Sequence, residues 1–402
     1  MKKKHYIMIA TSVLMMLLMG TVYSYSVFRV HIETLFDVGT LQSGLPYMTS
    51  LAFYALGVMV TGRLMKPSRL RGFVVIGTIL IALGWFISGI APSLGVLIFS
   101  YGVLIGSGVG IVYGIPIYIA QKQFPEKSGL ITGIILLGFG MSPLITAPLV
   151  KVLIDLLTIQ PAFIVFGAIF LVIQLPISFI YDTSIDEEVA TSKVEIKHYG
   201  IKPFKSIYIL FVIASTIGLM MIGLSYQIGV VYYEFNVLEV TASLSFFAIM
   251  NGIARPIFGR LMDKKGFVFS VRLSLMLIGI ASVIGILNQG NSLILFIMSF
   301  SLFWFNLGAW LAIVPAAVKS FYGMKLYSRV YGVMFTGYGV GAIIGTVVSG
   351  MIMDLLRWTT NLYMLVLVLI GISFVIASLI HRQVRISQMY IAKQTQGMVE
   401  EV

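Results

Sequence analysis

Hydrophobic residues occur along this chain in runs of about 20 or more, and short polar segments between the runs hold nearly all of the charged residues. A helix needs about 20 apolar residues to cross the hydrocarbon core of a bilayer. The pattern therefore predicts an all-α membrane protein with twelve transmembrane helices. The predicted spans are residues 6–29, 44–65, 72–90, 94–121, 128–150, 161–181, 207–233, 240–262, 269–287, 293–318, 328–352 and 361–381.

Two long uncharged stretches decide this number of spans. The segments Gly72–Gln121 and Ser274–Val318 contain no Asp, Glu, Lys or Arg, and each is too long for one helix. The first contains the turn signal Ala91-Pro92-Ser93, and the second contains Asn288-Gln289-Gly290-Asn291. Each stretch is therefore predicted to be a hairpin of two spans joined by a short loop.

Short motifs recur in the two halves of the chain at an offset of about 200 residues, as in transporters built from structural repeats. The matches are Ser24-Tyr25 with Ser225-Tyr226, Gly62–Lys66 with Gly259–Asp263, Pro116 with Pro315, and Gly133, Gly138, Phe139 and Gly140 with Gly332, Gly337, Tyr338 and Gly339. We expect two pseudo-symmetric six-helix bundles, residues 1–181 and 207–402, with a short tail after the last span. The polar segment 182–206 is predicted to be a cytoplasmic linker.

The composition supports a membrane protein, with 59% hydrophobic and 10% charged residues and a mean hydropathy of +1.01. A net charge of +12 would suggest nucleic-acid binding in a soluble protein, but here the basic residues cluster in alternate loops. The opposite loops hold only Arg29, Lys151 and Arg357. Basic loops face the cytoplasm, so both termini are predicted to be cytoplasmic in a bacterial plasma membrane.

The residue types that hold cofactors are scarce in the spans. The chain has no cysteine, and its four histidines, His5, His31, His198 and His381, lie at the borders of spans. We expect no metal and no cofactor. A membrane-embedded enzyme would require clustered His, Asp, Glu or Cys residues inside the spans, and the sequence shows no such cluster, so we expect a protein that is not an enzyme.

Arg255 is the one charged residue that lies well inside a predicted span. A charge at the bilayer centre costs from about 2.5 to more than 10 kcal/mol and normally faces a protein interior or an aqueous cavity. No acidic residue lies in the spans to neutralise it. A substrate anion is the expected partner, although the arginine could instead extend its side chain toward the cytoplasmic boundary.

Several motifs together resemble the major facilitator superfamily. In that superfamily the loop after the second span follows Gly-x-x-x-Asp-Arg/Lys-x-Gly, a pattern that Gly259–Gly266 matches. The resemblance implies a gating loop that includes Gly259, Asp263, Lys264 and Gly266. The first-half copy departs from the pattern, because Lys66 stands where the acid belongs and Pro67-Ser68 follows.

Within that superfamily the chain is similar to the oxalate/formate antiporter family, which is related to the monocarboxylate transporters. The motifs that carry the resemblance are Tyr25–Phe28, Gly108–Gly114, Phe124–Gly129, Asn251–Pro256 and Tyr331-Gly332. The resemblance implies that Arg255 binds a substrate carboxylate and that Tyr25, Tyr113, Trp310 and Phe335 line the cavity. The second cation of the oxalate carrier, a lysine in span eleven, falls on Tyr338, which favours monocarboxylates over oxalate.

Three further features bear on the binding site. Asn251 lies one turn before Arg255 and could orient the guanidinium, contact substrate or satisfy a helix contact. Tyrosines such as Tyr25, Tyr113 and Tyr338 can donate a hydrogen bond to a carboxylate but also serve as packing residues. Phe139, the repeat partner of Tyr338, completes the predicted site.

The predicted function is secondary transport of small organic anions, such as formate, acetate, lactate or pyruvate, by alternating access. Anion exchange and proton-coupled symport remain open, and exchange is favoured because no acid in the spans could neutralise Arg255 in an empty carrier. The many methionines and aromatic residues leave a polyspecific drug exporter as a further alternative. The expected partners are the anion and the lipid bilayer, with the protein acting as a monomer.

Overall fold

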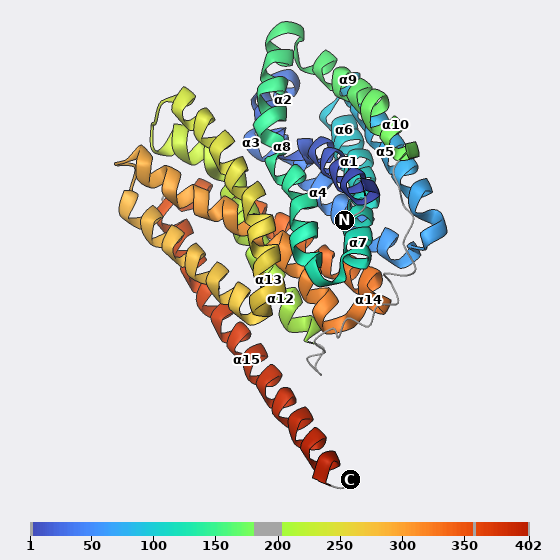
Figure 1. The fold of residues 1–402 in the computed structure, drawn as a ribbon. Helices are drawn as coiled ribbons and strands as arrows, with labels where there is room; N and C mark the ends of the chain where they lie inside the picture. The colour runs from blue at the N-terminus through green and yellow to red at the C-terminus, as the bar shows by residue number, and fades with distance from the viewer. Residues whose placement is uncertain (1–2, 181–202, 357–358, 401–402) are drawn as a thin grey trace.

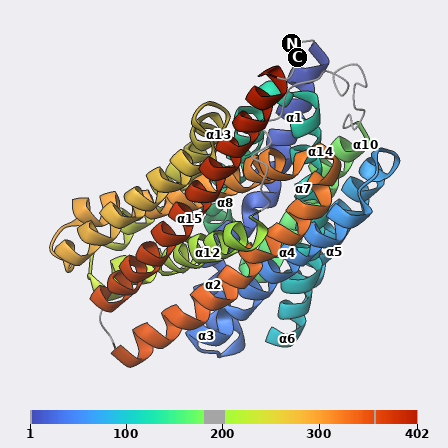
Figure 2. The same ribbon diagram turned by 90° about the horizontal axis from the view of Figure 1, so that it is seen from below.

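The computed structural model describes residues 3–180, 203–356 and 359–400, and these residues are helical apart from short connections. No strand occurs among them. The predicted linker at 182–206 lies almost entirely outside the described residues, and the helix that follows it begins at Phe204. Figures 1 and 2 show the helices in two views.

The first half contains helices in the order predicted for six spans. Its elements are α1 (Lys3–Met19), η1 (Gly20–Ser24), α2 (Tyr25–Phe36), α3 (Thr40–Ser43), α4 (Leu45–Leu64), η2 (Pro67–Arg69), α5 (Leu70–Gly89), α6 (Leu94–Leu97), η3 (Ile98–Ile105), α7 (Gly106–Gln123), η4 (Pro125–Lys127), α8 (Ser128–Leu157), α9 (Ile159–Ile169), η5 (Phe170–Gln174) and α10 (Leu175–Ile180). The second half contains α12 (Phe204–Gln227), η6 (Ile228–Tyr232), α13 (Val237–Asn288), α14 (Leu293–Leu356) and α15 (Thr359–Glu400).

Ten helical stretches of the described residues are long and apolar enough to cross a bilayer. Two of them, Val237–Asn288 and Leu293–Ser349, are each long enough for two spans. Within α13 the backbone turns at Gly266, and within α14 it turns at Gly323. Both glycines have a positive φ, 78° and 70°, a conformation that glycine adopts without a steric cost. Divided at these turns, the stretches give the twelve predicted spans.

The first span is not a regular helix over its whole length. The 3₁₀ turn η1 separates α1 from α2, and it contains Gly20. A side chain at Gly20 would collide with the carbonyl of Phe139 on α8, so the absence of a side chain lets the two backbones pack closely. Because a 3₁₀ turn has fewer residues per turn than an α-helix, η1 changes which side chains of α2 face the protein interior.

The last helix also differs from its prediction. The span predicted at 361–381 belongs to α15, which continues as one helix to Glu400. Figure 1 shows the red C-terminal part of α15 projecting away from the body of the molecule. The backbone of the predicted tail is therefore helical.

The two halves meet where α8 runs antiparallel to the first helix of α13 (Figure 1). Glycines carry this contact. A side chain on Gly259 would strike the carbonyl of Gly129, and one on Gly133 would strike the backbone of Arg255. Further along the same pair, Gly140 lies against Asn251 and Gly252. Small residues allow such close backbone approach between membrane helices.

A second antiparallel pair joins α4 to the second helix of α14. A side chain on Gly62 would strike the carbonyl of Ser328, and one on Gly332 would meet the backbone of Val58 and Met59. Farther along, Gly339 faces Ala55 and Ala52. Both pairs therefore hold the halves together on the side predicted to be cytoplasmic, which we call the inner side.

The helices of the first pair diverge beyond Gly140 and Gly252. The outer parts of α8 and α13 line opposite walls of a cavity, with Pro143 and Ala147 on one wall and Leu244 and Ser245 on the other. The molecule is therefore closed between the halves on the inner side and hollowed between them on the outer side.

The close approach of Gly259 and Gly129 generates a stability prediction. Gly259→Ala should lower the thermal unfolding midpoint of the purified protein, because the added methyl overpacks the interface at a cost of about 1–3 kcal/mol. Gly279→Ala is the matched control, because a methyl at Gly279 meets no atom within 4 Å. Both variants replace a helical glycine by alanine, so both gain the same intrinsic preference for the helix. Equal midpoints for the two variants would contradict the interface.

Candidate functional site

Arg255 is completely buried in the first helix of α13, at the level where α13 contacts α8. Its Nη1 donates a hydrogen bond of 2.8 Å to the carbonyl of Leu136 on α8. Its Nη2 donates one of 2.9 Å to Oδ1 of Asn251 on its own helix. Both acceptors are uncharged, so these bonds orient the guanidinium without neutralising it.

The remaining surroundings of the guanidinium are also neutral. No ion pair joins Arg255 to an acid within the described residues, and its Nε has no hydrogen-bond partner there. The guanidinium carbon lies 5.6 Å from the centre of the Phe139 ring, a cation–π arrangement. A Cβ on Gly140 would come within 2.9 Å of Nε, so the backbone of α8 packs closely against the guanidinium. The site therefore presents an uncompensated positive charge.

Asn251 holds Arg255 through a bond of its own. Its Nδ2 donates a 2.8 Å hydrogen bond to the carbonyl of Trp304 in α14, which turns Oδ1 toward the guanidinium. The side chain is buried and both ends of the amide are used. Of the roles open to Asn251 from the sequence, these bonds favour that of orienting Arg255.

Tyr23 of η1 lies beside Arg255, although the sequence did not identify it. Its hydroxyl interacts with the guanidinium and forms a 2.5 Å hydrogen bond with the hydroxyl of Tyr338. This bond crosses between the two halves, because Tyr338 belongs to α14. Tyr23 was missed because helical spacing places it on a different face from Tyr25, and the 3₁₀ turn cannot be read from the sequence.

A cluster of aromatic rings surrounds this group. Tyr113 packs against Phe139 at 5.5 Å and Phe335 at 5.3 Å, and Phe335 stacks on Tyr338 at 5.2 Å between ring centres. Tyr54 contacts all four of these rings. The structure therefore brings together Arg255, Asn251, Phe139, Tyr113, Phe335 and Tyr338.

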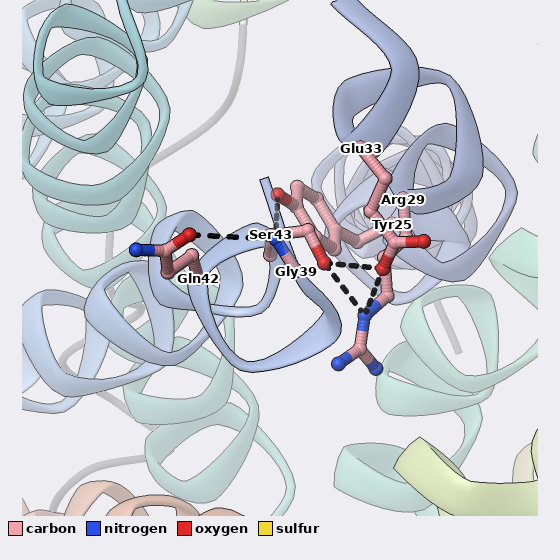
Figure 3. A network of polar contacts seen from close by, with 6 residues as sticks. All are labelled: Tyr25, Arg29, Glu33, Gly39, Gln42 and Ser43. Atoms are coloured by element: carbon pink, nitrogen blue, oxygen red, sulfur yellow. Dashed lines mark hydrogen bonds and ion pairs between the residues drawn. The ribbon is translucent and has the colours of Figure 1, made fainter. Parts of the chain in front are cut away.

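Two predicted site residues lie outside this cluster. The Tyr25 hydroxyl donates a 2.6 Å hydrogen bond to the carbonyl of Ser43 (Figure 3). The Tyr25 ring stacks on Tyr47 with 5.5 Å between the ring centres. Tyr25 lines the outer cavity instead of the Arg255 site. Trp310 is fully buried, with no partner for its indole N–H and no ring contact to the cluster among the described residues.

The cavity between the outer parts of the two halves, which we call the outer cavity, has a volume of about 250 Å³. It lies on the outer side of the aromatic cluster. Tyr23 and Trp304 are among its lining residues, whereas Arg255 is not. Because Tyr23 interacts with Arg255 and the Trp304 carbonyl accepts from Asn251, these two aromatic residues separate the cavity from the buried cation. Trp304, like Tyr23, was not identified from the sequence.

The predicted gating loop lies at the inner end of the same helix pair. The Asp263 carboxylate accepts hydrogen bonds of 3.0 and 2.9 Å from the backbone N–H groups of Gly129 and Leu130, in the first turn of α8. A carboxylate is favourable there because the N-terminus of a helix carries a partial positive charge. Gly259 packs against Gly129, Gly266 forms the turn, and Lys264 is exposed.

Lys319 makes a second inner contact that the sequence did not indicate by itself. Its Nζ donates hydrogen bonds of 2.6 Å to the Pro125 carbonyl and to the Ser128 hydroxyl, both of the first half. The offset of the repeat at Pro116 and Pro315 pairs it with Ala120, so the repeat gave no signal for it. Within the described residues, no group of three His, Asp or Glu side chains could hold a metal ion.

Comparisons with known proteins agree with this architecture. The profile of the Major Facilitator Superfamily matches residues 9–323. The chain is 24% identical to an uncharacterised transporter of this type, YhjX of Escherichia coli, over 81% of this chain and 82% of that protein. It is also 24% identical to the oxalate:formate antiporter of Oxalobacter formigenes, over 71% and 69% of the two chains.

Human monocarboxylate transporter 12 is 23% identical over 80% of this chain and 70% of its own length. The crystal structure of the human organic anion transporter MFSD10 superimposes with a TM-score of 0.67 at 12% identity, covering 94% of this chain and all of the other. That likeness concerns the fold. Since the profile spans most of the sequence, the chain belongs to the Major Facilitator Superfamily of membrane transporters.

Proposed function

We propose that this transporter carries small organic anions and that Arg255 binds their carboxylate group. The observation that carries the proposal is a completely buried guanidinium whose described partners are all uncharged. A cation in such a place is stabilised by an anion, and a planar guanidinium matches a carboxylate with two parallel hydrogen bonds. The buried Nε has no hydrogen-bond partner among the described residues, so it can donate one of them.

The contacts between the halves support transport by alternating access. Arg255 lies near the point where α8 and α13 change from close contact to divergence, with glycine contacts on the inner side and the cavity on the outer side. Separation of the inner contacts would break the bonds of Asp263 and Lys319 to the first half. A central site between two rocking halves is the arrangement typical of such carriers.

The names of the relatives support an anionic substrate. They include an oxalate:formate antiporter and monocarboxylate transporters, and the superimposed structure is that of an organic anion transporter. Within this class we favour monocarboxylates such as formate, acetate, lactate or pyruvate. The aromatic cluster offers hydroxyl groups but no second cation, and the resemblance to the oxalate/formate antiporter family implies that Tyr338 stands where the oxalate carrier has a lysine.

We favour anion exchange over proton-coupled symport. An empty carrier would have to reorient with Arg255 unneutralised, whereas a bound carboxylate would cancel that charge. Proton symport usually uses an acid that pairs with the arginine when the site is empty, and none contacts Arg255 within the described residues. We also expect a monomer in a bacterial plasma membrane with both termini in the cytoplasm.

The first test replaces the guanidinium by an ammonium. Arg255→Lys should reduce uptake of labelled formate or lactate into proteoliposomes about 10- to 100-fold, because one charge-assisted hydrogen bond contributes about 1.5–3 kcal/mol. Arg260→Lys, at an exposed position one turn or so farther along the helix, is the matched control and should retain uptake. Near-normal uptake by folded Arg255→Lys protein would assign Arg255 a structural role only.

The second test concerns the charge of the substrate. Formate, acetate, lactate and pyruvate should compete for uptake more strongly than oxalate or malonate. Tyr338→Lys should shift this preference toward the dicarboxylates by adding a second cation, whereas Tyr338→Phe removes the hydroxyl without adding charge and should not. If oxalate is already the strongest competitor in the natural protein, the argument from one cation is wrong.

The third test distinguishes exchange from symport. Uptake of labelled anion should be several-fold faster into vesicles preloaded with unlabelled anion than into empty ones, because the loaded carrier reorients with its charge cancelled. The measurement compares both vesicle types with and without an inward proton gradient. Strong uptake into empty vesicles that depends on this gradient would favour the symporter.

A further inference from the structure

The outer cavity carries positive charge that the central site does not use. Arg29 of α2 and Lys151 of α8 both line it, and no Asp or Glu is found among the described residues of its lining. The other walls are apolar and aromatic, including Tyr47, Tyr226 and Trp304. A cleft with cations and walls of low polarity concentrates small anions.

Each cation is paired with an acid that is not among the lining residues of the cavity. The Arg29 Nε lies 3.7 Å from Oε1 of Glu33, and the Lys151 Nζ lies 2.8 Å from Oδ2 of Asp155. In both helices the acid follows the cation by four residues, which places it one turn farther outward. Figure 3 shows the Arg29 Nε facing Glu33 and Ser43, with the two terminal nitrogens on the other side of the guanidinium.

The position of these cations departs from the charge pattern of the chain. The outer loops hold only Arg29, Lys151 and Arg357, and two of these three line the same cavity. An ion pair with this spacing contributes little to the stability of a helix, wherever on the helix it lies. Helix stabilisation alone therefore does not explain why both cations face the cavity.

We propose that Arg29 and Lys151 form an outer capture site for a small organic anion, separate from the site at Arg255. Tyr23 and Trp304 lie between the two sites. An anion bound in the cavity lies against Tyr23 and Trp304 until it passes to Arg255. The identity of the anion as a carboxylate rests on the proposed function, whereas the sign of the charge rests on the cavity lining.

The natural lack of cysteine allows a direct measurement of the potential in this cavity. Ser245→Cys places a single thiol in the lining, and its rates of reaction with an anionic sulfonatoethyl and a cationic trimethylammonioethyl methanethiosulfonate are compared. Lys151→Gln should lower the ratio of anionic to cationic rates about threefold or more at low ionic strength. Asp155→Asn should raise it, which excludes a general loss of structure as the cause.

The control thiol is Asn291→Cys, exposed in the outer turn between α13 and α14 and outside the cavity. Its rate ratio should be insensitive to Lys151→Gln. Arg29→Gln added to Lys151→Gln should lower the ratio at Ser245→Cys further, provided that the protein remains folded. An unchanged ratio at Ser245→Cys, or equal changes at both thiols, would overturn the proposal.

This measurement does not depend on transport. If the cavity attracts the anionic reagent but no carboxylate is carried, the capture site stands and the proposed substrate class is wrong. If carboxylates are carried but Lys151→Gln leaves the rate ratio unchanged, the proposed function stands and the proposed capture site is wrong.

Discussion

The structure depends on one constraint, the burial of a positive charge inside a membrane protein without an acidic partner. Arg255 is held by the Leu136 carbonyl and the Asn251 amide, and Asn251 is held in turn by the Trp304 carbonyl. Leu136 belongs to the first half, whereas the other groups belong to the second. The cation is therefore anchored at the surface along which the halves meet, so relative motion of the halves changes its surroundings.

The packing between the halves differs on the two sides of Arg255. Toward the inner side, α8 and α13 touch through glycines, and the charges of Asp263 and Lys319 are satisfied by groups of the first half. Toward the outer side, the same helices separate and line a cavity. Close glycine contacts bring many atoms together without interlocking side chains, which suits the separation of the halves that the proposed alternating access requires.

Aromatic residues separate the outer cavity from the surroundings of Arg255. Tyr23 and Trp304 form the floor of the outer cavity, and the cluster around Tyr113, Phe335 and Tyr338 lies with Arg255. Rings supply an apolar wall, and tyrosine hydroxyls can still bond an anion. The bond between Tyr23 and Tyr338 joins the halves directly, so movement of Tyr23 and separation of the halves are physically linked.

The sequence by itself determined the spans, the repeat and the isolated charge of Arg255 inside a span, because hydrophobic length and an isolated charge are local properties of the chain. It also identified most of the residues around the guanidinium. The tertiary structure decided that Tyr25 lines the outer cavity while Tyr23 reaches Arg255, and that Trp310 stands apart from the cluster. The 3₁₀ turn at Gly20–Ser24 and the phase of each helix set these contacts, and both arise from packing between segments far apart in the sequence.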